Sequence, residues 1–378
     1  MKFSCTQENL SRGLNVVSHI TSKNVNLPIL NNVLIKIKDK NLEFSTTNLE
    51  LAINCFIRGK VEQGGEFTIP SRLFADYVGL LPKETVDIEI TDENLDIECA
   101  NYNTKIKGMP ASEFPLIPKI NKIKKYNCAV DGLKRALGQV VFSASPNESR
   151  PELSGVYLEF NREGAAQKLT VAATDSYRLG ESVLSLAQES SKENAVAIVP
   201  SRTITELLRI IALLKDGVES PENIEVAFSE NQVVFTLAGI ELVSRLIEGQ
   251  YPDYAQIVPT NLKTKAQVSK DDLIKAIKAT SLFSKTGLFD VTLELKPNNE
   301  IVVMSSDLQR GENKVRLGAK ISGEENSVTL NYRYLLEGLN ALGHDDINLS
   351  LVDSTNPCLL SAQGKEGEYF YIIMPIKK

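Results

Sequence analysis

Six stretches of the chain carry apolar residues every three or four positions, which is the spacing of one face of an α-helix. Three of them follow a repeated motif, first Ile69-Pro70-Ser71-Arg72, then Val199-Pro200-Ser201-Arg202 and, more loosely, Leu330-Asn331-Tyr332-Arg333. Successive copies start 130 and 131 residues apart. The motif therefore predicts the start of a helix in three equivalent units.

A second helical motif lies roughly 60 residues before each copy of the first. Its three versions are Leu10-Ser11-Arg12-Gly13-Leu14, Leu133-Lys134-Arg135-Ala136-Leu137 and Leu273-Ile274-Lys275-Ala276-Ile277. Small polar residues precede the six predicted helices and can cap their first backbone amides. The expected N-caps are Thr6, Ser71, Asp131, Ser201, Ser269 and Asn331.

Apolar and polar residues alternate between the helical stretches, as they do in half-buried β-strands. Residues 33–37 and 42–45 form one predicted hairpin, and residues 291–295 and 301–304 form another across a Pro-Asn-Asn turn. The pattern predicts an α+β fold of six helix-plus-strand units, paired into three repeated domains. Each domain places two helices on antiparallel sheets.

Two proline-containing stretches mark the expected boundaries between the domains. The first holds Pro115, Pro118 and the basic residues 119–125, and the second holds Pro252 and Pro259. We therefore expect domains at residues 1–125, 126–255 and 256–378.

A basic residue recurs at matching places in the six helical motifs. Three of these residues fall in first helical turns, where the helix dipole disfavours a cation by about 0.3–1 kcal/mol. One interpretation is a solvated helix face inherited by duplication; the other is a shared surface for an anionic partner such as duplex DNA, bound through its phosphates without sequence specificity. The repeated set favours the second interpretation. It comprises Arg12, Arg72, Arg135, Arg202, Lys275 and Arg333, with Lys134, Arg209 and Lys278 beside them.

Composition adds little to this picture but excludes some classes. A net charge of −6 does not exclude nucleic acid, because binding depends on where the cations lie. The five cysteines stand far apart without a C-x-x-C pair, so we expect buried free thiols and neither a disulfide framework nor a zinc site. The N-terminus lacks a signal-peptide pattern and apolar runs are short, so we expect a cytoplasmic protein that does not enter a membrane.

Signs of catalysis are weak. The two histidines, His19 and His344, lack a metal-ligand pattern, and nucleotide-binding or nucleophile motifs are absent from the sequence. Asp175 could be a general base, although a turn carboxylate is favoured. We therefore expect no enzyme, cofactor or metal. Two alternatives stay open: an enzyme resembling the six-repeat enolpyruvyl transferases, and a protein-binding scaffold without DNA.

Four segments resemble the bacterial DNA polymerase III beta sliding clamp family. They are Asn26-Leu27-Pro28-Ile29-Leu30-Asn31-Asn32, Ala173-Thr174-Asp175-Ser176-Tyr177-Arg178-Leu179, Glu248-Gly249-Gln250-Tyr251-Pro252-Asp253-Tyr254 and Ile372-Ile373-Met374-Pro375-Ile376. The resemblance covers essentially the whole chain. It implies a head-to-tail homodimeric ring, with helices lining a hole for duplex DNA. It also implies tethering of a replicative polymerase, a clamp loader and other proteins through short linear motifs.

The resemblance also implies particular site residues. Many family members carry Arg where this chain has Gln256, and tyrosines are common where it has Pro151 and Glu152. Ring closure would bring Ile106 of one subunit to Leu282 and Phe283 of the other, although core packing is an equal alternative for these three. DNA would also meet loops at Lys23 and Asn24 and at Asn147 and Arg150. The implied motif-binding cleft comprises Leu153, Thr174, Tyr177, Arg178, Leu179, Pro252, Ile257, Ile373, Met374, Pro375 and Ile376.

Overall fold

The computed structural model describes residues 1–21, 27–38, 41–117, 124–147, 149–162, 167–215, 221–364 and 367–377. The chain divides into two compact units. The first comprises Met1–Val130, Glu189–Ser191 and Glu206–Leu246, and the second comprises Asp131–Gln188, Lys192–Thr205 and Ile247–Lys378. Neither unit coincides with a predicted domain, so the boundaries at 125/126 and 255/256 stay a prediction.

The six predicted helices are all present in the part of the chain that the structure describes, and none of them is long and apolar enough to cross a membrane. Thr6, Ser269 and Asn331 cap their helices as expected, because each side chain accepts a backbone N–H. The prediction for Ser71 is wrong: the N-cap is Pro70, and the Ser71 hydroxyl is buried inside the helix. Asp131 also lies inside its helix, in the first turn. The helices are α1 (Gln7–Val17), α2 (Ser71–Leu80), α3 (Val130–Val140), α4 (Ser201–Lys215), α5 (Lys270–Ser281) and α6 (Tyr332–Ala341).

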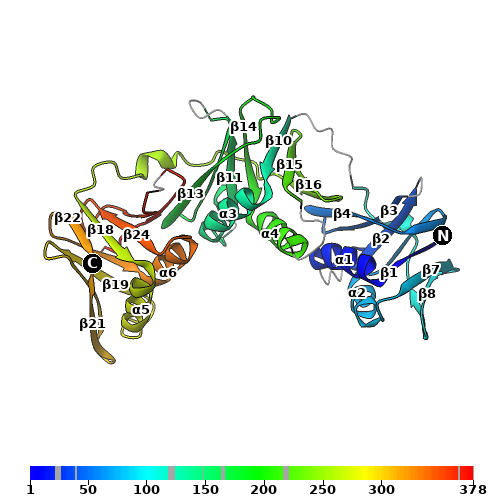
Figure 1. Ribbon diagram of the computed structural model, residues 1–378, viewed down its shortest axis with the longest axis horizontal. Helices are drawn as coiled ribbons and strands as arrows, with labels where there is room; N and C mark the ends of the chain where they lie inside the picture. Colours follow the sequence, from blue (N-terminus) through cyan, green and yellow to red (C-terminus); the bar gives the residue numbers. More distant parts are fainter. Residues whose placement is uncertain are drawn as a thin grey trace. The chain divides into compact units, whose positions relative to one another are not determined.

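The first unit contains two antiparallel sheets, of five and eight strands, with α1 and α2 packed side by side (Figure 1). The smaller sheet has the order β5-β1-β7-β8-β9, and the larger has the order β10-β15-β16-β17-β4-β3-β2-β6. Apolar side chains on one face of β3 and β4 pack against α1, because alternate strand residues point to the same side. The strands are β1 (Lys2–Thr6), β2 (Asn32–Lys38), β3 (Asn41–Thr47), β4 (Leu51–Ile57), β5 (Lys60–Gln63), β6 (Gly65–Pro70), β7 (Thr85–Thr91), β8 (Asn94–Cys99), β9 (Tyr102–Lys107), β10 (Lys124–Ala129), β15 (Asn223–Phe228), β16 (Gln232–Leu237) and β17 (Ile240–Arg245).

The second unit contains an antiparallel sheet of nine strands and another of four (Figure 1). Their orders are β14-β11-β12-β13-β26-β25-β24-β18-β22 and β21-β20-β19-β23, and α5 packs against β20 and β21. The predicted hairpins are confirmed as β2–β3 and β19–β20. The strands are β11 (Gly155–Phe160), β12 (Lys168–Thr174), β13 (Arg178–Ser185), β14 (Ala195–Pro200), β18 (Thr264–Ser269), β19 (Asp290–Lys296), β20 (Glu300–Asp307), β21 (Gly311–Gly318), β22 (Lys320–Gly323), β23 (Asn326–Asn331), β24 (Asp346–Leu351), β25 (Cys358–Ala362) and β26 (Tyr369–Ile373).

Each long sheet joins two shorter ones through a single pair of antiparallel strands. In the first unit β4 pairs with β17, so that Ala52 lies opposite Val243. In the second unit β13 pairs with β26, and Leu179 lies opposite Ile372. These two pairs connect segments far apart in sequence, and we refer to them as the junctions.

All five cysteines are buried free thiols, as the sequence predicts. Burial raises the pKa of the Cys5, Cys55 and Cys128 thiols to about 12. These thiols therefore stay protonated near neutral pH and behave as small apolar core residues.

Candidate functional site

A tight turn at residues 174–178 joins β12 to β13 at the second junction. Asp175 Oδ1 accepts the backbone N–H groups of Tyr177 at 2.9 Å and Arg178 at 3.0 Å. The Thr174 hydroxyl donates to the Arg178 carbonyl at 2.6 Å, and Ser176 adopts a left-handed φ of 77°. The turn interpretation of Asp175 is therefore confirmed. Its consequence is that the Tyr177 side chain points outward, 64% exposed.

Arg178 is buried and its guanidinium is fully engaged. It pairs with Asp175 at 3.1 Å and with Glu337 on α6, and donates to the Phe142 carbonyl at 2.7 Å. Its guanidinium carbon also lies 4.4 Å from the ring centroid of Tyr334, a cation–π contact. Arg178 therefore anchors the turn to the neighbouring helix and has little of its surface left for a ligand.

The C-terminal segment runs beside this turn. Ile373 ends β26 and is fully buried, whereas Met374, Pro375 and Ile376 are half-buried. The Met374 amide donates to the Tyr177 carbonyl at 2.8 Å. The structure thus brings together two segments that the family resemblance assigned to one cleft.

An apolar cluster underlies these two segments. It contains Leu179, Ile372, Tyr251 and Tyr254. Leu179, one of the implied cleft residues, is fully buried, because it packs against Tyr251, Tyr254 and Ile372 in this cluster. The other predicted cleft residues differ in exposure. Leu153 and Thr174 are buried, Pro252 is half-buried, and Ile257 is 41% exposed.

A half-buried acid, Glu181, lies beside the cluster, and no sequence motif marks it. The Tyr254 hydroxyl donates to Glu181 Oε2 at 2.6 Å. Burial raises the pKa of Glu181, and the hydrogen bond from Tyr254 partly offsets this. Burial likewise raises the pKa of Tyr254, so its hydroxyl remains a donor. The pair fixes the position of Tyr254 within the short 3₁₀ helix Tyr254–Ile257.

The residues at which this chain departs from the common family pattern make contacts within their own loops. Glu152 pairs with Arg150 at 3.0 Å, and Arg150 also donates to the Ser176 hydroxyl at 3.3 Å. Gln256 donates to Asp253 at 2.8 Å. The negative charge of Glu152 is therefore matched by a cation within its own loop, and that cation touches the cleft turn.

The predicted DNA-contact residues lie in different surroundings. Asn147, Arg150 and Lys278 are exposed, as are the six recurring cations, and Lys134 is half-buried. The Arg333 guanidinium lies 3.7 Å from the centroid of the Phe289 ring. Lys23 and Asn24 fall outside the described residues.

Arg209 differs from the other predicted DNA contacts because its guanidinium is used within the first unit. It pairs with Glu206 and donates to the carbonyls of Asn15 and Val16, which end α1. Glu206 Oε2 also forms a hydrogen bond of 2.7 Å with His19 Nδ1. These contacts give Arg209 and His19 a structural role.

The predicted subunit-contact residues are divided between the two units. Ile106 is 6% exposed and faces its own core opposite Leu95 on β8. Leu282 follows α5 and is 68% exposed, and Phe283 beside it is half-buried. Only Leu282 therefore offers a large free apolar surface.

Repeated pairs of helices on antiparallel sheets, with the sheets joined end to end, define the DNA-clamp class of fold. Three family models of the DNA polymerase III beta subunit match the chain: the N-terminal domain over residues 1–118, the central domain over 127–253 and the C-terminal domain over 255–377. The chain belongs to this family, the bacterial beta sliding clamps. It is a DNA polymerase processivity factor and not an enzyme.

Individual relatives agree along the full length. The beta sliding clamp of Synechococcus elongatus is 30% identical over 381 residues, covering 100% of this chain and 99% of that protein. The solved DNA polymerase sliding clamp from Bacillus subtilis is 27% identical, with a TM-score of 0.91 and coverage of 100% and 99%. The beta subunit structure from Thermotoga maritima shares the fold, with a TM-score of 0.90 at 24% identity and coverage of 100% and 99%. The enolpyruvyl-transferase alternative finds no support.

Proposed function

We propose that two copies of this chain close head-to-tail into a ring around duplex DNA in the cytoplasm. The ring tethers a replicative polymerase, a clamp loader and other proteins that carry linear motifs. The basic helix residues make weak, sequence-independent phosphate contacts, and the cleft around Tyr177 and Met374 receives the motifs. The three domains are those expected at residues 1–125, 126–255 and 256–378.

The observation that carries the ring proposal is a pair of unmatched sheet edges. Strand β9 of the first unit is equivalent to β17 and β26, because each is the last strand of a run of four that begins just before a helix. The three runs are β1-β7-β8-β9, β10-β15-β16-β17 and β18-β24-β25-β26. Strand β21 of the second unit is likewise equivalent to β4 and β13. The equivalents pair with each other at the two junctions, whereas β9 and β21 are edge strands. Edge strands are templates for pairing, and joining β9 to β21 of another copy would make the third junction.

The turn before β21 supports this equivalence. Asp307 Oδ1 accepts the backbone N–H groups of Gln309 and Arg310, as Asp175 does for Tyr177 and Arg178. Arg310 then donates to the carbonyl of Leu282 at 3.5 Å, as Arg178 does to Phe142. Leu282 therefore lies beside the edge at which a partner would pair.

The internal junctions also set the register of the proposed pair. Lys105 corresponds to Val243, because Tyr102 and Ile240 each follow a two-residue turn. Asn313 faces α5, since it accepts from the Thr280 hydroxyl at 3.2 Å, so Glu312 faces the opposite side of its sheet. Lys105 also faces away from the core, opposite in direction to buried Ile106. Lys105 on β9 and Glu312 on β21 therefore both point away from the helices. With β9 of one copy paired to β21 of the other, the two residues would lie opposite each other as a cross-strand pair of opposite charge.

Disulfide trapping tests the ring and its register together. The double variant Lys105→Cys with Glu312→Cys should form covalent dimers in mild oxidant, because opposite residues in antiparallel strands are about 4.5–5.5 Å apart at Cα. The control combines Lys105→Cys with Arg316→Cys, four residues and about 13 Å farther along β21. Equal trapping of both pairs, or of neither, would refute this interface.

A further inference from the structure

We propose that the second unit holds a phosphate-binding pocket, in which Arg135 on α3 and His344 just after α6 bind the phosphate oxygens. The pocket lies at the second junction, on the sheet face opposite the cleft. Its ligand is a phosphate group, either free or carried by a nucleic-acid backbone. The proposal goes beyond the function described above, and it needs neither ring closure nor the cleft.

The pocket and the cleft lie on opposite faces of the β13–β26 pair, because successive strand residues point to opposite sides. Leu179 packs into the cleft cluster, whereas a β-carbon at Gly180 would lie 3.3 Å from the Gln139 carbonyl of α3. Ser182, two residues farther along β13, donates to Gln139 Oε1 at 3.0 Å. The pocket is a cavity of about 180 Å³ beside these two side chains. A water molecule occupies about 30 Å³, so the cavity has room for a phosphate group and its remaining waters.

The buried side of the pocket is a closed hydrogen-bond network. Gln139 Nε2 donates to the Ala341 carbonyl at the end of α6, at 3.2 Å, and its Oε1 accepts from Ser182. The Tyr369 hydroxyl donates to the Gln139 carbonyl at 3.0 Å. Burial raises the pKa of Tyr369, so this hydroxyl stays protonated. These groups use their donors on one another, so the charge of a ligand must be met at the rim.

The rim carries two exposed basic side chains, Arg135 and His344. In the part of the chain that the structure describes, neither of them has a side-chain hydrogen bond or an ion pair. They differ in this from Arg178 and Arg209, whose guanidinium groups are used within the protein. Guanidinium and imidazolium donors suit phosphate oxygens, because charge-assisted hydrogen bonds are roughly twice as strong as neutral ones.

The first junction explains why the pocket is open at the second. There Arg12, the counterpart of Arg135, lines an equivalent pocket between α1 and β4, but its volume is only about 30 Å³. Leu214, in the last turn of α4, also lines that pocket and is buried. α4 has 15 residues and α6 has 10, although both begin at the same repeated motif. α6 therefore lacks the turn that carries Leu214, and Gly343 and His344 lie at the rim instead.

The charges around His344 make phosphate binding depend on pH. Lys270 adds a cation nearby, since its ammonium donates to the Leu342 carbonyl at 2.9 Å. Glu368 lines the pocket and opposes an anion, and Asp345 and Asp346 follow His344 in the chain. With a neutral imidazole these acids offset the cations; a protonated imidazole adds a positive charge at the rim, so affinity should rise at acidic pH. The titratable residues of the lining are Arg135, His344, Glu368 and Tyr369.

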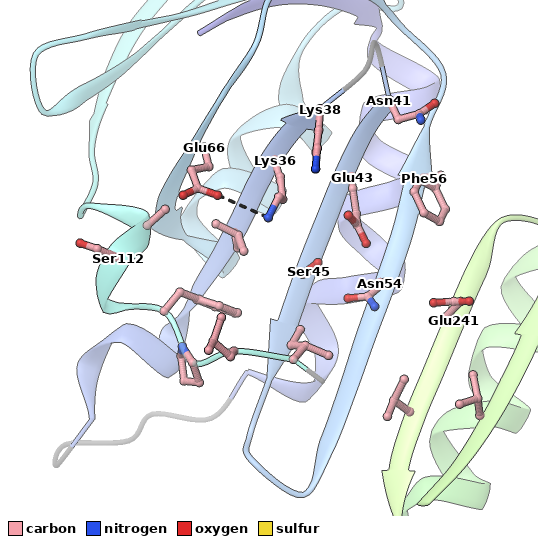
Figure 2. A pocket seen from close by; sticks show the side chains of 18 residues that line it. Lys36, Lys38, Asn41, Glu43, Ser45, Asn54, Phe56, Glu66, Ser112 and Glu241 are labelled. Carbon is pink, nitrogen blue, oxygen red and sulfur yellow. Dashed lines mark ion pairs between the residues drawn. The ribbon is translucent and has the colours of Figure 1, made fainter. Parts of the chain in front are cut away.

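Size alone does not select a phosphate. A larger cavity in the first unit, of about 910 Å³ over β2, β3, β4 and β17, is lined by three glutamates and two lysines (Figure 2). One of the lysines, Lys36, is paired with Glu66 at 3.5 Å. Carboxylates repel an anion, so this cavity does not suit a phosphate. The glutamates are Glu43, Glu66 and Glu241, and the second lysine is Lys38.

Histidine NMR of the full-length chain tests the pocket directly, because the chain has only two histidines, His19 and His344. With a carbon-13 label at histidine Cε1, inorganic phosphate should shift the His344 signal saturably, relative to sodium chloride at equal ionic strength. The His19 signal should stay in place, since His19 is bonded to Glu206. His344→Gln assigns the signals by removing one of them.

Sulfate isolates the contribution of the imidazole, because this tetrahedral dianion does not itself titrate near neutral pH. Its affinity should fall several-fold between about pH 6 and about pH 8, the range over which imidazole loses its proton. An affinity that does not change over this range would remove His344 from the site.

Two variants and a control measure the charges of the lining. Arg135→Gln should weaken phosphate binding by about ten-fold. Glu368→Gln should strengthen it several-fold, because it removes the opposing charge, and a gain in affinity cannot come from misfolding. Lys320→Gln removes an exposed cation of the same unit that does not line the pocket, and it should have no effect.

A short blunt duplex at low salt identifies the source of the phosphate. A His344 shift with both the duplex and inorganic phosphate would mean that the pocket is open to DNA, and a shift with inorganic phosphate alone would make the ligand a free phosphate; both results support the pocket. A shift with the duplex alone, an equal shift with sodium chloride, or phosphate binding that ignores Arg135→Gln would overturn the proposal. None of these results bears on whether the chain forms a ring.

Discussion

The backbone amide of Met374 donates a hydrogen bond of 2.8 Å to the carbonyl oxygen of Tyr177. This bond extends the β13–β26 pairing by one residue past the end of β26. Met374 is thus the first residue of the C-terminal segment to leave the buried sheet, and it leaves beside the turn that exposes Tyr177. The turn and the C-terminal segment form a single surface with an apolar base.

Met374→Ala should weaken the binding of a polymerase-derived linear-motif peptide by about ten-fold or more. A few anchors carry most of the energy of such binding, and each costs about 1–4 kcal/mol when truncated. The melting temperature should change little, because Met374 is only half-buried. Anisotropy with the peptide and thermal unfolding of the same samples measure both quantities.

Ile373→Ala is the matched control one residue earlier. Ile373 is fully buried in β26, so its truncation should lower the free energy of unfolding by about 2–5 kcal/mol. If Met374→Ala lost that much stability and kept its peptide affinity, Met374 would be an ordinary core residue.

Arg178 and Tyr177 should separate stability from binding within one turn. Arg178→Met should lower the free energy of unfolding by about 3–5 kcal/mol, because it leaves Asp175 buried without its cation. Tyr177→Ala should leave stability unchanged and weaken peptide binding, since the ring is exposed. Urea unfolding with peptide titration distinguishes the two. Equal stability of both variants would contradict the structural role assigned to Arg178.

Periodicity was sufficient to predict the six helices and the main hairpins, because local spacing determines which face of each element is apolar. The capping of Thr6 and Asn331 was also predictable, since an N-cap bonds to an amide two or three residues away. The error at Ser71 came from the preceding Pro70, which takes the cap position itself.

Long-range pairing could not be predicted in this way. Leu179 is buried because it packs against Ile372 on β26 and against Tyr251 and Tyr254, and nothing near Leu179 in sequence reports these partners. Arg178 finds Glu337 on α6, and Glu206 finds His19 beyond the end of α1. The cleft residues themselves came from family resemblance, because a half-buried Met374 and a buried Ile373 have similar local patterns.

Glu181 should make stability depend on pH. Burial raises its folded-state pKa above the unfolded value, so between these two values the folded state holds a proton that the unfolded state has lost. Its contribution to stability is therefore present at acidic pH and is lost as pH rises through the folded pKa. Glu181→Gln should remove this dependence and raise stability at neutral pH. Urea unfolding from about pH 4 to about pH 8 measures this pH dependence. The lower limit is about the pKa of an unfolded glutamate, and the upper limit is well above it.

Tyr254→Phe provides a second test of the same pair. Removing the hydroxyl deletes the hydrogen bond that lowers the pKa of Glu181, so the pKa should rise further. The variant should lose more stability at alkaline than at acidic pH. A loss independent of pH would show that the Glu181–Tyr254 bond is not coupled to protonation.

Leu282→Asp with Phe283→Asp should convert the proposed dimer to monomers. Each copy would place two carboxylates in an apolar contact, and the closed ring contains that contact twice. Val196→Asp is the control, because Val196 is also exposed and apolar but lies on β14, outside the proposed contact. Analytical ultracentrifugation should give monomers for the first variant and dimers for the second. An intact dimer in the double variant would refute the assignment of Leu282.

DNA retention should depend on the topology of the DNA more than on affinity. The net charge is −6 and the candidate contacts are dispersed, so direct phosphate binding should be weak and should fall as salt rises. A ring loaded on nicked circular DNA should therefore persist, and should be lost over the end when the circle is cut. Gel filtration of the loaded complex before and after linearisation measures this. Arg72→Ala with Arg202→Ala should shorten retention modestly on both substrates without removing the difference between them. Equal lifetimes of the unaltered protein on circular and linear DNA would count against encirclement, because an open surface has no reason to distinguish them.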